Sequence, residues 1–344
     1  MTDADLAAAV RAAVADWIDA TTQAQQQMEM ANPATLGAVL GLTVEHTLQA
    51  AGHDPAALRE RVLQAPYCHL QGVFDASSLV DTPTAFNPVP DTTATLAGRA
   101  AVLAVHGLLR METVSYGAEN GGHLFVNLVV LAGQGAMPEK SKKGLRGHTD
   151  GVSLPFNGDD DANDVRIAPS PDLVTLVGLR NPKAVPTKLM PLDDILAHML
   201  PGDVAELKKP QYSIHSQKTF VQGMKAVLGR ELVVIDEPVL KDVGQGTYVR
   251  YSHRSVSPTV SGGAAEQASR NFEAACIQTV VPLVVQPGDV LVVSNRVSLH
   301  GRGEPSGEVG GQSRWLLRTY ALDTSKLAAH KRHLGASPPH VLFP

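Results

Sequence analysis

The feature that most restricts the fold of this chain is a series of short apolar runs that begins near residue 112. Clear examples are the segments DLVTLVGLR and RWLLRTYAL. Turn-forming residues separate these runs, and one pair, Asn120-Gly121, predicts a hairpin turn. Short strands with such punctuation are typical of a β-sandwich or a β-barrel. The sequence therefore predicts a β core over residues 111–325.

The first 110 residues show the apolar spacing of helices instead. Thr2 followed by Asp5 resembles a capping box at the start of a helix. Further helices are expected after Pro33, over 54–66 and over 96–110, with a Pro- and Thr-rich extended connector at 74–93. We expect these helices to form a layer on the β core. Another helix is expected as an insertion at 192–209.

Composition favours a soluble globular protein, since 44% of the residues are hydrophobic and 18% are charged. We expect one domain spanning 1–344, with 1–110 mostly helical, 111–325 as the core and 326–344 as a C-terminal tail. The net charge of −5 gives no electrostatic basis for binding nucleic acid or an anionic membrane. The two cysteines form no CxxC motif, and the acidic N-terminus lacks the basic region of a secretory signal. A cytoplasmic protein with a small-molecule partner is expected, and a homodimer stays open.

The segment GHTDG contains a candidate pair of metal ligands, His148 and Asp150. With 13 histidines and 34 acidic residues in 344 positions, chance alone gives roughly one such triplet, so the pair needs support from elsewhere. Residues i and i+2 of a strand point the same way, which lets the two side chains converge. A facial triad for Fe(II) needs one more histidine. His300 is the candidate, because it ends an apolar run and is followed by glycines that permit close approach.

Two arginines follow this histidine in the last apolar run. Arg314 and Arg318 are spaced by four, so they face the same side of a strand. A guanidinium that points into a barrel is costly unless it meets an anion, and its fork suits a carboxylate. Arg314 is therefore a candidate clamp for a dicarboxylate that chelates iron at its other end. The hydroxyl of Thr175 is a candidate for a further hydrogen bond to that carboxylate.

The order of ENGGHLFVNLVV, GHTDG, DLVTLVGLRNPKAVPT and LVVSNRVSLHGRG…SRWLLRTY resembles the Fe(II)/2-oxoglutarate-dependent oxygenases of the clavaminate-synthase-like branch, which includes asparagine oxygenase and arginine β-hydroxylases. The resemblance covers roughly residues 70–325. It implies a mainly β fold with α elements, built on a double-stranded β-helix (jelly-roll) core. It also implies Fe(II), 2-oxoglutarate and O₂ as cofactor and cosubstrates.

The resemblance assigns roles to the candidate residues. It implies that His148, Asp150 and His300 bind iron, that Arg314 clamps 2-oxoglutarate with Thr175 as a less direct match, and that Arg318 holds a substrate carboxylate. Asn127 is a candidate for the substrate amine, and a structural role in holding backbone is equally compatible with its place in a strand. Amino-acid hydroxylases of this branch commonly carry Glu in place of Asp150. Since halogenating relatives need a small residue there, Asp150 favours hydroxylation.

The segment VRYSHR indicates which charge the substrate side chain carries. Arginine-hydroxylating relatives carry acidic residues near the end of a comparable LRY segment, where this chain has Ser252, His253 and Arg254. We therefore expect Arg254 to face a neutral or anionic substrate tail. The acidic segment 156–166 does not match an EF-hand, because it lacks the required Gly and Glu, and a surface loop is expected.

The resemblance thus implies an oxygenase that hydroxylates an unactivated C–H of an amino acid or a similar small acid of secondary metabolism, releasing succinate and CO₂. Desaturation or cyclisation by the same cofactor is also compatible with these ligands. Two rival classes stay open: a non-catalytic jelly-roll protein that binds a carboxylate, and a cupin-like metal enzyme that does not use 2-oxoglutarate. The absence of HExxH, GxSxG and Walker A motifs excludes the enzyme classes that depend on them.

Overall fold

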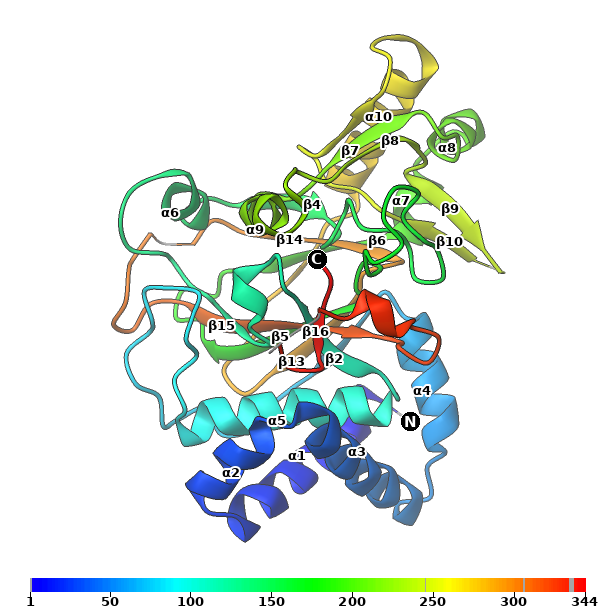
Figure 1. Ribbon diagram of the computed structural model, residues 1–344. Coiled ribbons are helices and arrows are strands. Elements are labelled where there is room, and N and C mark those ends of the chain that lie inside the picture. Colours follow the sequence, from blue (N-terminus) through cyan, green and yellow to red (C-terminus); the bar gives the residue numbers. More distant parts are fainter. Residues whose placement is uncertain (1, 245, 306, 334–336) are drawn as a thin grey trace.

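The computed structural model describes residues 2–244, 246–305, 307–333 and 337–344. Its elements lie in layers (Figure 1): the N-terminal helices at one end, then a large sheet, then a smaller sheet, and an inserted region of helices and strands at the other end. The fold is therefore mixed α and β with several sheets. None of the helices in the described residues combines the length and the apolar character needed to cross a bilayer.

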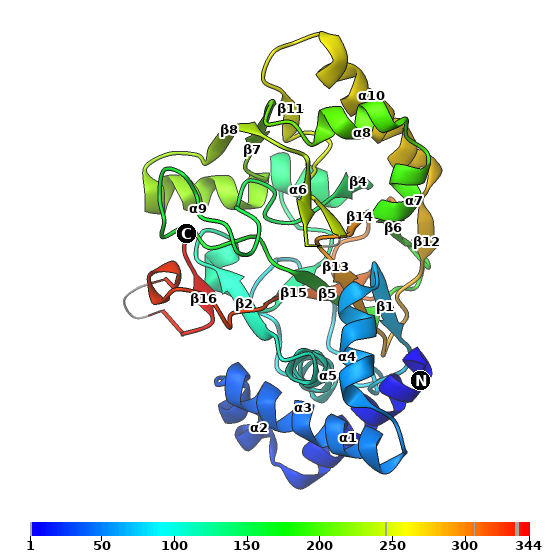
Figure 2. The same cartoon turned by 90° about the vertical axis from the view of Figure 1, so that its right-hand side faces the viewer.

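The N-terminal helices form where the apolar spacing predicts them. They are α1 (Asp3–Ala20), α2 (Gln23–Met30), α3 (Pro33–Ala50), α4 (Pro55–Gln64) and α5 (Thr93–Leu108). The predicted capping box is confirmed: the Thr2 hydroxyl accepts a hydrogen bond from the Asp5 amide, and the Asp5 carboxylate accepts one from the Thr2 amide at 2.7 Å. Helix α5 is buried along most of its length, because it lies between α1 and α3 on one side and the large sheet on the other (Figure 2).

The large sheet has two apolar faces. Its strands are β1 (Tyr67–Leu70), β13 (Val290–Ser294), β5 (Leu173–Arg180), β15 (Trp315–Leu322), β2 (Glu112–Tyr116) and β16 (Val341–Leu342) in that order, with β3 (Val126–Leu128) also paired to β15. Along β5, Leu173 and Val177 face the helical layer, whereas Val174 and Leu176 belong to a second core on the opposite face. This alternation follows from the period of two of a β-strand.

The smaller sheet covers the second face of the large sheet. Its strands are β12 (Val281–Leu283), β6 (Thr187–Pro191), β14 (Ser298–Arg302) and β4 (Leu145–His148), in that order. Leu189 of β6 packs into the core shared with the large sheet. Its neighbour Met190, and Leu299 of β14, pack instead against the inserted region. The smaller sheet therefore separates the inserted region from the space between the sheets.

The inserted region between β6 and β12 is larger than the single helix expected at 192–209. It contains α7 (Leu192–Ala197), α8 (Pro201–Leu207), β7 (Tyr212–His215), α9 (Lys218–Leu228), β8 (Val233–Glu237), β9 (Leu240–Val243), β10 (Gly246–Val249), β11 (Val256–Pro258) and α10 (Gly263–Gln278). The expected helix is split in two because Pro201 has no amide hydrogen to continue α7, but suits the first turn of α8.

The predicted hairpin at Asn120-Gly121 is wrong. Strands β2 and β3 do not pair with each other, because both pair with the long strand β15, where Val114 lies opposite Tyr320 and Asn127 opposite Leu317. The segment between them forms the short 3₁₀ helix η1 (Asn120–Gly122), with positive φ at Asn120 and Gly121. The Asn-Gly pair thus makes the tight turn that its φ preference predicts, but the turn does not reverse the chain.

Two short elements and the strand β16 complete the chain. The short elements are α6 (Ala136–Ser141) and η2 (Ala329–Lys331). Strand β16 pairs in parallel with β2, so the segment expected as a C-terminal tail contributes to the large sheet.

Helices α3 and α5 approach each other at glycines. A Cβ atom added to Gly107 would lie 1.9 Å from the carbonyl oxygen of Gly37, and one added to Gly41 would lie 2.4 Å from the carbonyl carbon of Gly107. Both distances are far below van der Waals contact with backbone atoms, which cannot move aside as a flexible side chain can. The contact between these helices therefore requires glycine.

We expect Gly107→Ala to lower the free energy of unfolding by about 3 kcal/mol, because the two helices must separate to admit the methyl group. Urea denaturation measures this change. Gly202→Ala in α8 is the control, since a Cβ there meets nothing within 4 Å, and alanine is the better helix former. A Gly107→Ala protein as stable as the parent would contradict the packing described.

Candidate metal centre

The three predicted metal ligands lie together. His300 of β14 and His148 of β4 are direct partners in the antiparallel register of these strands, and their ring centroids are 4.4 Å apart. Leu299 packs against the inserted region, so His300 on the alternate side points between the two sheets. Asp150 follows β4 by two residues and points to the same place.

The distances among the three side chains suit a metal ion. Asp150 Oδ1 lies 3.7 Å from His148 Nε2, and Asp150 Oδ2 lies 3.5 Å from His300 Nε2. The ligand atoms of all three residues lie within 4.8 Å of one another. Three ligands about 2.1 Å from one octahedral metal are roughly 3 Å apart. The two distances from Asp150 therefore need to shorten by less than about an ångström around an ion.

The charge states also suit a metal. Burial, together with the neighbouring His300, lowers the pKa of His148 to about 4, so its imidazole is neutral at pH 7. Burial alone would raise the pKa of Asp150, but His300 and the charge of Arg318 outweigh it and hold the pKa of this carboxyl well below its usual range. A neutral imidazole and an ionised carboxylate are the forms that bind metal ions.

Side chains beyond the cluster hold its ligands in place. His148 Nδ1 lies 2.9 Å from the carbonyl oxygen of Arg146, which orients Nε2 toward Asp150. The Asn295 amide accepts from the Asp150 backbone N–H at 2.8 Å and donates to the Asp150 carbonyl at 2.9 Å. Gln217, just before α9, binds Gly151 N–H at 2.9 Å in the same way. Neither amide is predicted from the sequence, because nothing in a single sequence shows which amide meets which backbone.

Arg314 is a buried cation that lacks an anion. Its Nε has no hydrogen-bond partner, and within the described part of the chain no carboxylate pairs with its guanidinium. Burial lowers the pKa of Arg314 to about 9, and the nearby charge of Arg302 contributes. Burying an unpaired guanidinium is strongly unfavourable. The position is therefore suited to an anionic ligand, as the sequence predicts.

Arg318 lies at the cluster but is already paired. Its NH2 group donates to Glu119 at 2.7 Å, and its NH1 group lies 3.7 Å from Asp150. The Tyr320 hydroxyl donates to the same Glu119 oxygen at 2.9 Å. The other oxygen of Glu119 and the Nε of Arg318 are buried without partners. Glu119 is not among the residues predicted from the sequence, because it lies in the Asn-Gly segment far from the metal motif.

The structure does not bring Thr175 to the site, and its assignment to 2-oxoglutarate is corrected. Its hydroxyl lies 2.8 Å from His106 Nε2 of α5, and the other ring nitrogen of His106 lies 2.8 Å from the Thr113 hydroxyl. Thr175 therefore faces the helical layer, on the opposite side of the sheet from the second core. Side chains along a strand point alternately to its two faces, so Thr175 lies on the face of Leu173 and Val177 and not on the face of Leu176.

Asn127 is also remote from the cluster, and its assignment to a substrate amine is corrected. Its amide donates to the carbonyls of Ala85 and Pro88 and accepts from Trp315 Nε1 at 2.9 Å. The Asn127 side chain is fully buried, and both of its polar atoms are used in these hydrogen bonds. The bonds hold the extended connector that contains Ala85 and Pro88. These contacts support the structural role in holding backbone.

Arg254 lies on the exposed side of the segment that borders the site. Ser252, two residues before it, forms a β-bridge with His148. The preceding His253 turns away, with its Nε2 3.0 Å from Glu273. Arg254 itself is exposed and forms no ion pair within the described residues.

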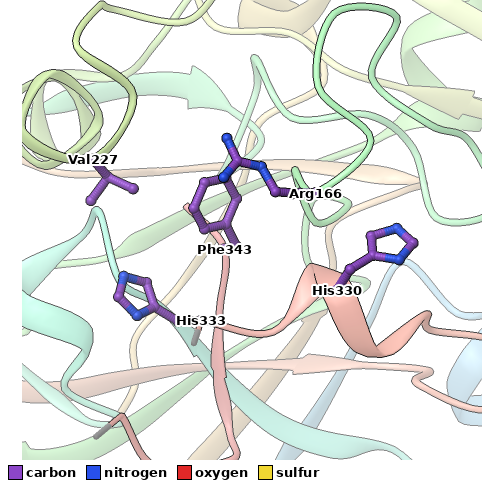
Figure 3. A pocket seen from close by; sticks show the side chains of 5 residues that line it. All are labelled: Arg166, Val227, His330, His333 and Phe343. Atoms are coloured by element: carbon purple, nitrogen blue, oxygen red, sulfur yellow. The ribbon is translucent and has the colours of Figure 1, made fainter. Parts of the chain in front are cut away.

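A separate cavity of about 260 Å³ lies beside the C-terminal segment, lined by Arg166, Val227, His330, His333 and Phe343. Figure 3 shows the Arg166 guanidinium stacked on the Phe343 ring, with the centre of the guanidinium 4.6 Å from the ring centroid. Arg166 is paired with Asp164 at 2.7 Å. The cavity includes none of the clustered ligands, so we assign it no part in their chemistry.

We expect His300→Ala to abolish stoichiometric Fe(II) binding under anaerobic conditions while the protein stays folded, because two ligands from one short segment do not make a facial triad. Equilibrium dialysis measures the metal, and circular dichroism checks the fold. His198→Ala, at an exposed histidine, should bind metal as the parent does. Full metal binding by His300→Ala would remove this residue from the site.

We expect Thr175→Val to lower the free energy of unfolding by about 1–3 kcal/mol, because a buried nitrogen of His106 loses its partner. The same variant should bind 2-oxoglutarate as the parent does, since Thr175 faces away from the cluster. Urea denaturation and a cosubstrate titration separate the two effects. Weakened cosubstrate binding without loss of stability would return Thr175 to the cosubstrate site.

Comparison with known proteins shows related sequences. No family model matches the chain. The L-lysine 3-hydroxylase of Catenulispora acidiphila is 24% identical over 320 residues, which covers 87% of this chain and 84% of that protein. The L-asparagine oxygenase of Streptomyces coelicolor is 35% identical over 79 residues, which covers 22% of this chain and 24% of that protein.

Solved structures show the same fold. Asparagine oxygenase in complex with Fe(II), 3-hydroxyasparagine and succinate aligns over 91% of this chain and 97% of its own, with a TM-score of 0.69 and 20% identity. The non-heme iron oxygenase OrfP, in complex with Fe, succinate and dihydroxyarginine, aligns over 98% of this chain and 97% of its own, with a TM-score of 0.74 and 19% identity. The resemblance seen in the sequence is thereby confirmed, and the chain is a relative of the Fe(II)/2-oxoglutarate-dependent oxygenases that include asparagine oxygenase.

Proposed function

We propose that this protein is an Fe(II)- and 2-oxoglutarate-dependent oxygenase that hydroxylates an unactivated C–H bond of a free amino acid. Two observations carry the proposal: the cluster of His148, Asp150 and His300, and the buried Arg314, which lacks an anion and is influenced by the charge of Arg302 on the strand of His300. The curated relative acts as an L-lysine 3-hydroxylase, and a solved neighbour binds Fe(II) with hydroxyasparagine and succinate. A jelly-roll protein that merely binds a carboxylate needs the arginine but not three metal ligands.

His148, Asp150 and His300 would hold Fe(II), and Arg314 would hold the far carboxylate of 2-oxoglutarate. When bound, iron with this cosubstrate and O₂ supplies the oxidant that removes hydrogen from a C–H bond. Three protein ligands leave the remaining positions of the metal open to cosubstrate and O₂. The Arg314 guanidinium would pair with its anion in a dry site, where a charge-assisted pair is stronger than in water.

The pair formed by Glu119 and Arg318 supports an amino acid as substrate. An amino acid carries an ammonium and a carboxylate, and here a carboxylate oxygen and a guanidinium Nε are both buried without partners next to the cluster. Glu119 would accept from the ammonium, and Arg318 would donate to the carboxylate. Since Arg318 also reaches Asp150 at 3.7 Å, the substrate would be oriented directly beside the metal. Arg254 at the rim would face its neutral or anionic tail.

We also infer that the two facing sheets form a double-stranded β-helix, in one domain over 1–344. Strands along the chain alternate between the sheets. In chain order, β5 of the large sheet comes between β4 and β6 of the smaller sheet, and β14 of the smaller sheet comes between β13 and β15 of the large sheet. The helical N-terminal part joins this core, since β1 pairs with β13 and α5 packs on β5. The C-terminal segment joins it through β16.

The proposal predicts a weak visible charge-transfer band when Fe(II) and 2-oxoglutarate are added without O₂, and amino-acid-dependent succinate release when O₂ is admitted. We expect Arg314→Gln to raise the Kd for 2-oxoglutarate by about 30- to 100-fold, because a charge-assisted pair contributes about 2–3 kcal/mol. Titration of the band measures this Kd. A product that gains the mass of one oxygen atom distinguishes hydroxylation from desaturation or cyclisation.

Arg166→Gln is the matched control, because Arg166 is paired with Asp164 and lines the separate cavity. Its band and its succinate release should equal those of the parent. Absence of the band from the metal-loaded parent would remove 2-oxoglutarate from the proposal. Absence of succinate with every free amino acid, despite a normal band, would instead remove this substrate class.

A further inference from the structure

Three segments that border the metal cluster each carry a cation without an ion-pair partner in the described residues. These cations are Lys140, Lys218 and Arg254. Iron binding uses none of them, and Arg314 already serves the cosubstrate in the proposed function. Their position relative to the cluster follows from contacts that join each segment to a metal ligand or to a residue within two positions of one.

The segment of Lys140 is pinned to the strand of His300. Lys140 lies in the last turn of α6, and Arg302 on β14 donates to the carbonyls of Ser141 at 3.0 Å and Lys143 at 2.8 Å, just beyond it. Arg302 is two residues from His300, so the two side chains share one face of the strand. The end of α6 therefore lies over the side of β14 that carries the metal ligand.

The other two segments are tied to the GHTDG loop. The side chain of Gln217, next to Lys218, donates to the Thr149 carbonyl at 3.0 Å and accepts from Gly151 N–H at 2.9 Å. Ser252, two residues before Arg254, forms a bridge with His148. Lys218 and Arg254 thus belong to two segments joined to the loop that carries the metal ligands, and both side chains are exposed.

Lys140 is the central member of this set. It is half-buried, and its charge acts on Asp150 and on Lys218, Arg254 and Arg302. Burial lowers the pKa of Lys140, Asp150 opposes that change, and the neighbouring cations add to it. These cations have one ionised carboxylate near them, Asp150, and a bound metal would neutralise its charge. An additional anion would therefore stabilise the group of cations.

Carboxylates of the acidic loop and of Glu273 are already engaged by cations. The acidic loop at 156–166 pairs internally and with distant lysines: Asp159 lies 2.5 Å from Lys241, and Asp160 lies 2.7 Å from Lys331. The Glu273 carboxylate is shared by Arg146 and His253, each at 3.0 Å. These three carboxylates are thus paired, whereas Lys140, Lys218 and Arg254 have no ion-pair partner in the described residues.

We infer that Lys140, with Lys218 and Arg254 at the rim, forms a subsite for an anionic side chain, and that the substrate is an amino acid whose side chain ends in a carboxylate. This inference rests on the proposed function and names its substrate class. Lys140 is then the residue that determines specificity.

The test compares acidic, amide and basic amino acids on the iron-loaded full chain. L-Glutamate and L-aspartate are set against L-glutamine, L-asparagine, L-lysine and L-arginine, with succinate release as the rate and anaerobic perturbation of the charge-transfer band as the binding measurement. We expect an acidic amino acid to bind tightest. Lys140→Gln should raise its KM about tenfold with kcat changed less than about twofold, since the charge acts on binding and not on the reacting bond.

Two further variants sharpen the result. Lys140→Arg should keep the preference for acid over amide, because it keeps the charge. Lys142→Gln should change nothing, since Lys142 is paired with Glu139 at 3.0 Å on the same loop. The KM for the matching amide substrate should move less than about twofold in Lys140→Gln.

The inference is overturned if a basic amino acid binds tightest to the parent, if Lys140→Gln changes acid and amide substrates equally, or if no acidic amino acid perturbs the anaerobic band. Failure of the proposed function is a different result. In that case acidic amino acids bind anaerobically in a Lys140-dependent way but release no succinate in O₂. Such binding would support the anion subsite on its own.

Discussion

The Asp150 carboxylate is the point on which the rest of the site depends. It lies 3.5–3.7 Å from two imidazoles of the smaller sheet and 3.7 Å from Arg318 of the large sheet. A buried carboxylate is costly unless cations or donors surround it. The fold meets this requirement with groups from both sheets, so the two sheets meet at the place where the metal would bind. The bonds of Asn295 to the backbone of Asp150 keep the carboxylate there.

Electrostatics also divides the site into parts. Arg314 is a buried cation without an anion. Arg318 and Glu119 form an ion pair, and each of them has one buried polar atom without a hydrogen-bond partner. Lys140 lies near further cations. Each part suits a different ligand group: the far carboxylate of a cosubstrate, the ammonium and carboxylate of an amino acid, and an anionic tail. The relatives share the fold and the metal chemistry, but the charge at the rim is set by this chain's own residues.

Elements that depend on local rules could be predicted from the sequence. The capping box at Thr2 starts α1, and Pro residues start α3, α4 and α8 as their fixed φ requires. Elements whose partners lie far apart in the chain could not. The Asn-Gly pair predicted a hairpin, but β15 is long enough to pair with both β2 and β3, so the two strands lie along one partner. The single helix expected at 192–209 is two helices within a larger insertion.

For the site, the sequence by itself determined the chemistry of the ligands. A His-x-Asp triplet, a later histidine and two arginines spaced by four favour a metal and carboxylate ligands. The structure brings the three candidate metal ligands together, places Arg318 at 3.7 Å from Asp150, and buries Arg314 without an anion. Only the tertiary structure decided which faces the other residues take. Thr175 and Asn127 lie on strands of the same sheet, yet the parity of each strand points them away from the metal. Glu119 lies between β2 and η1, and Lys140 lies in the short helix α6. The position of both segments depends on long-range contacts, which no local pattern in the sequence records.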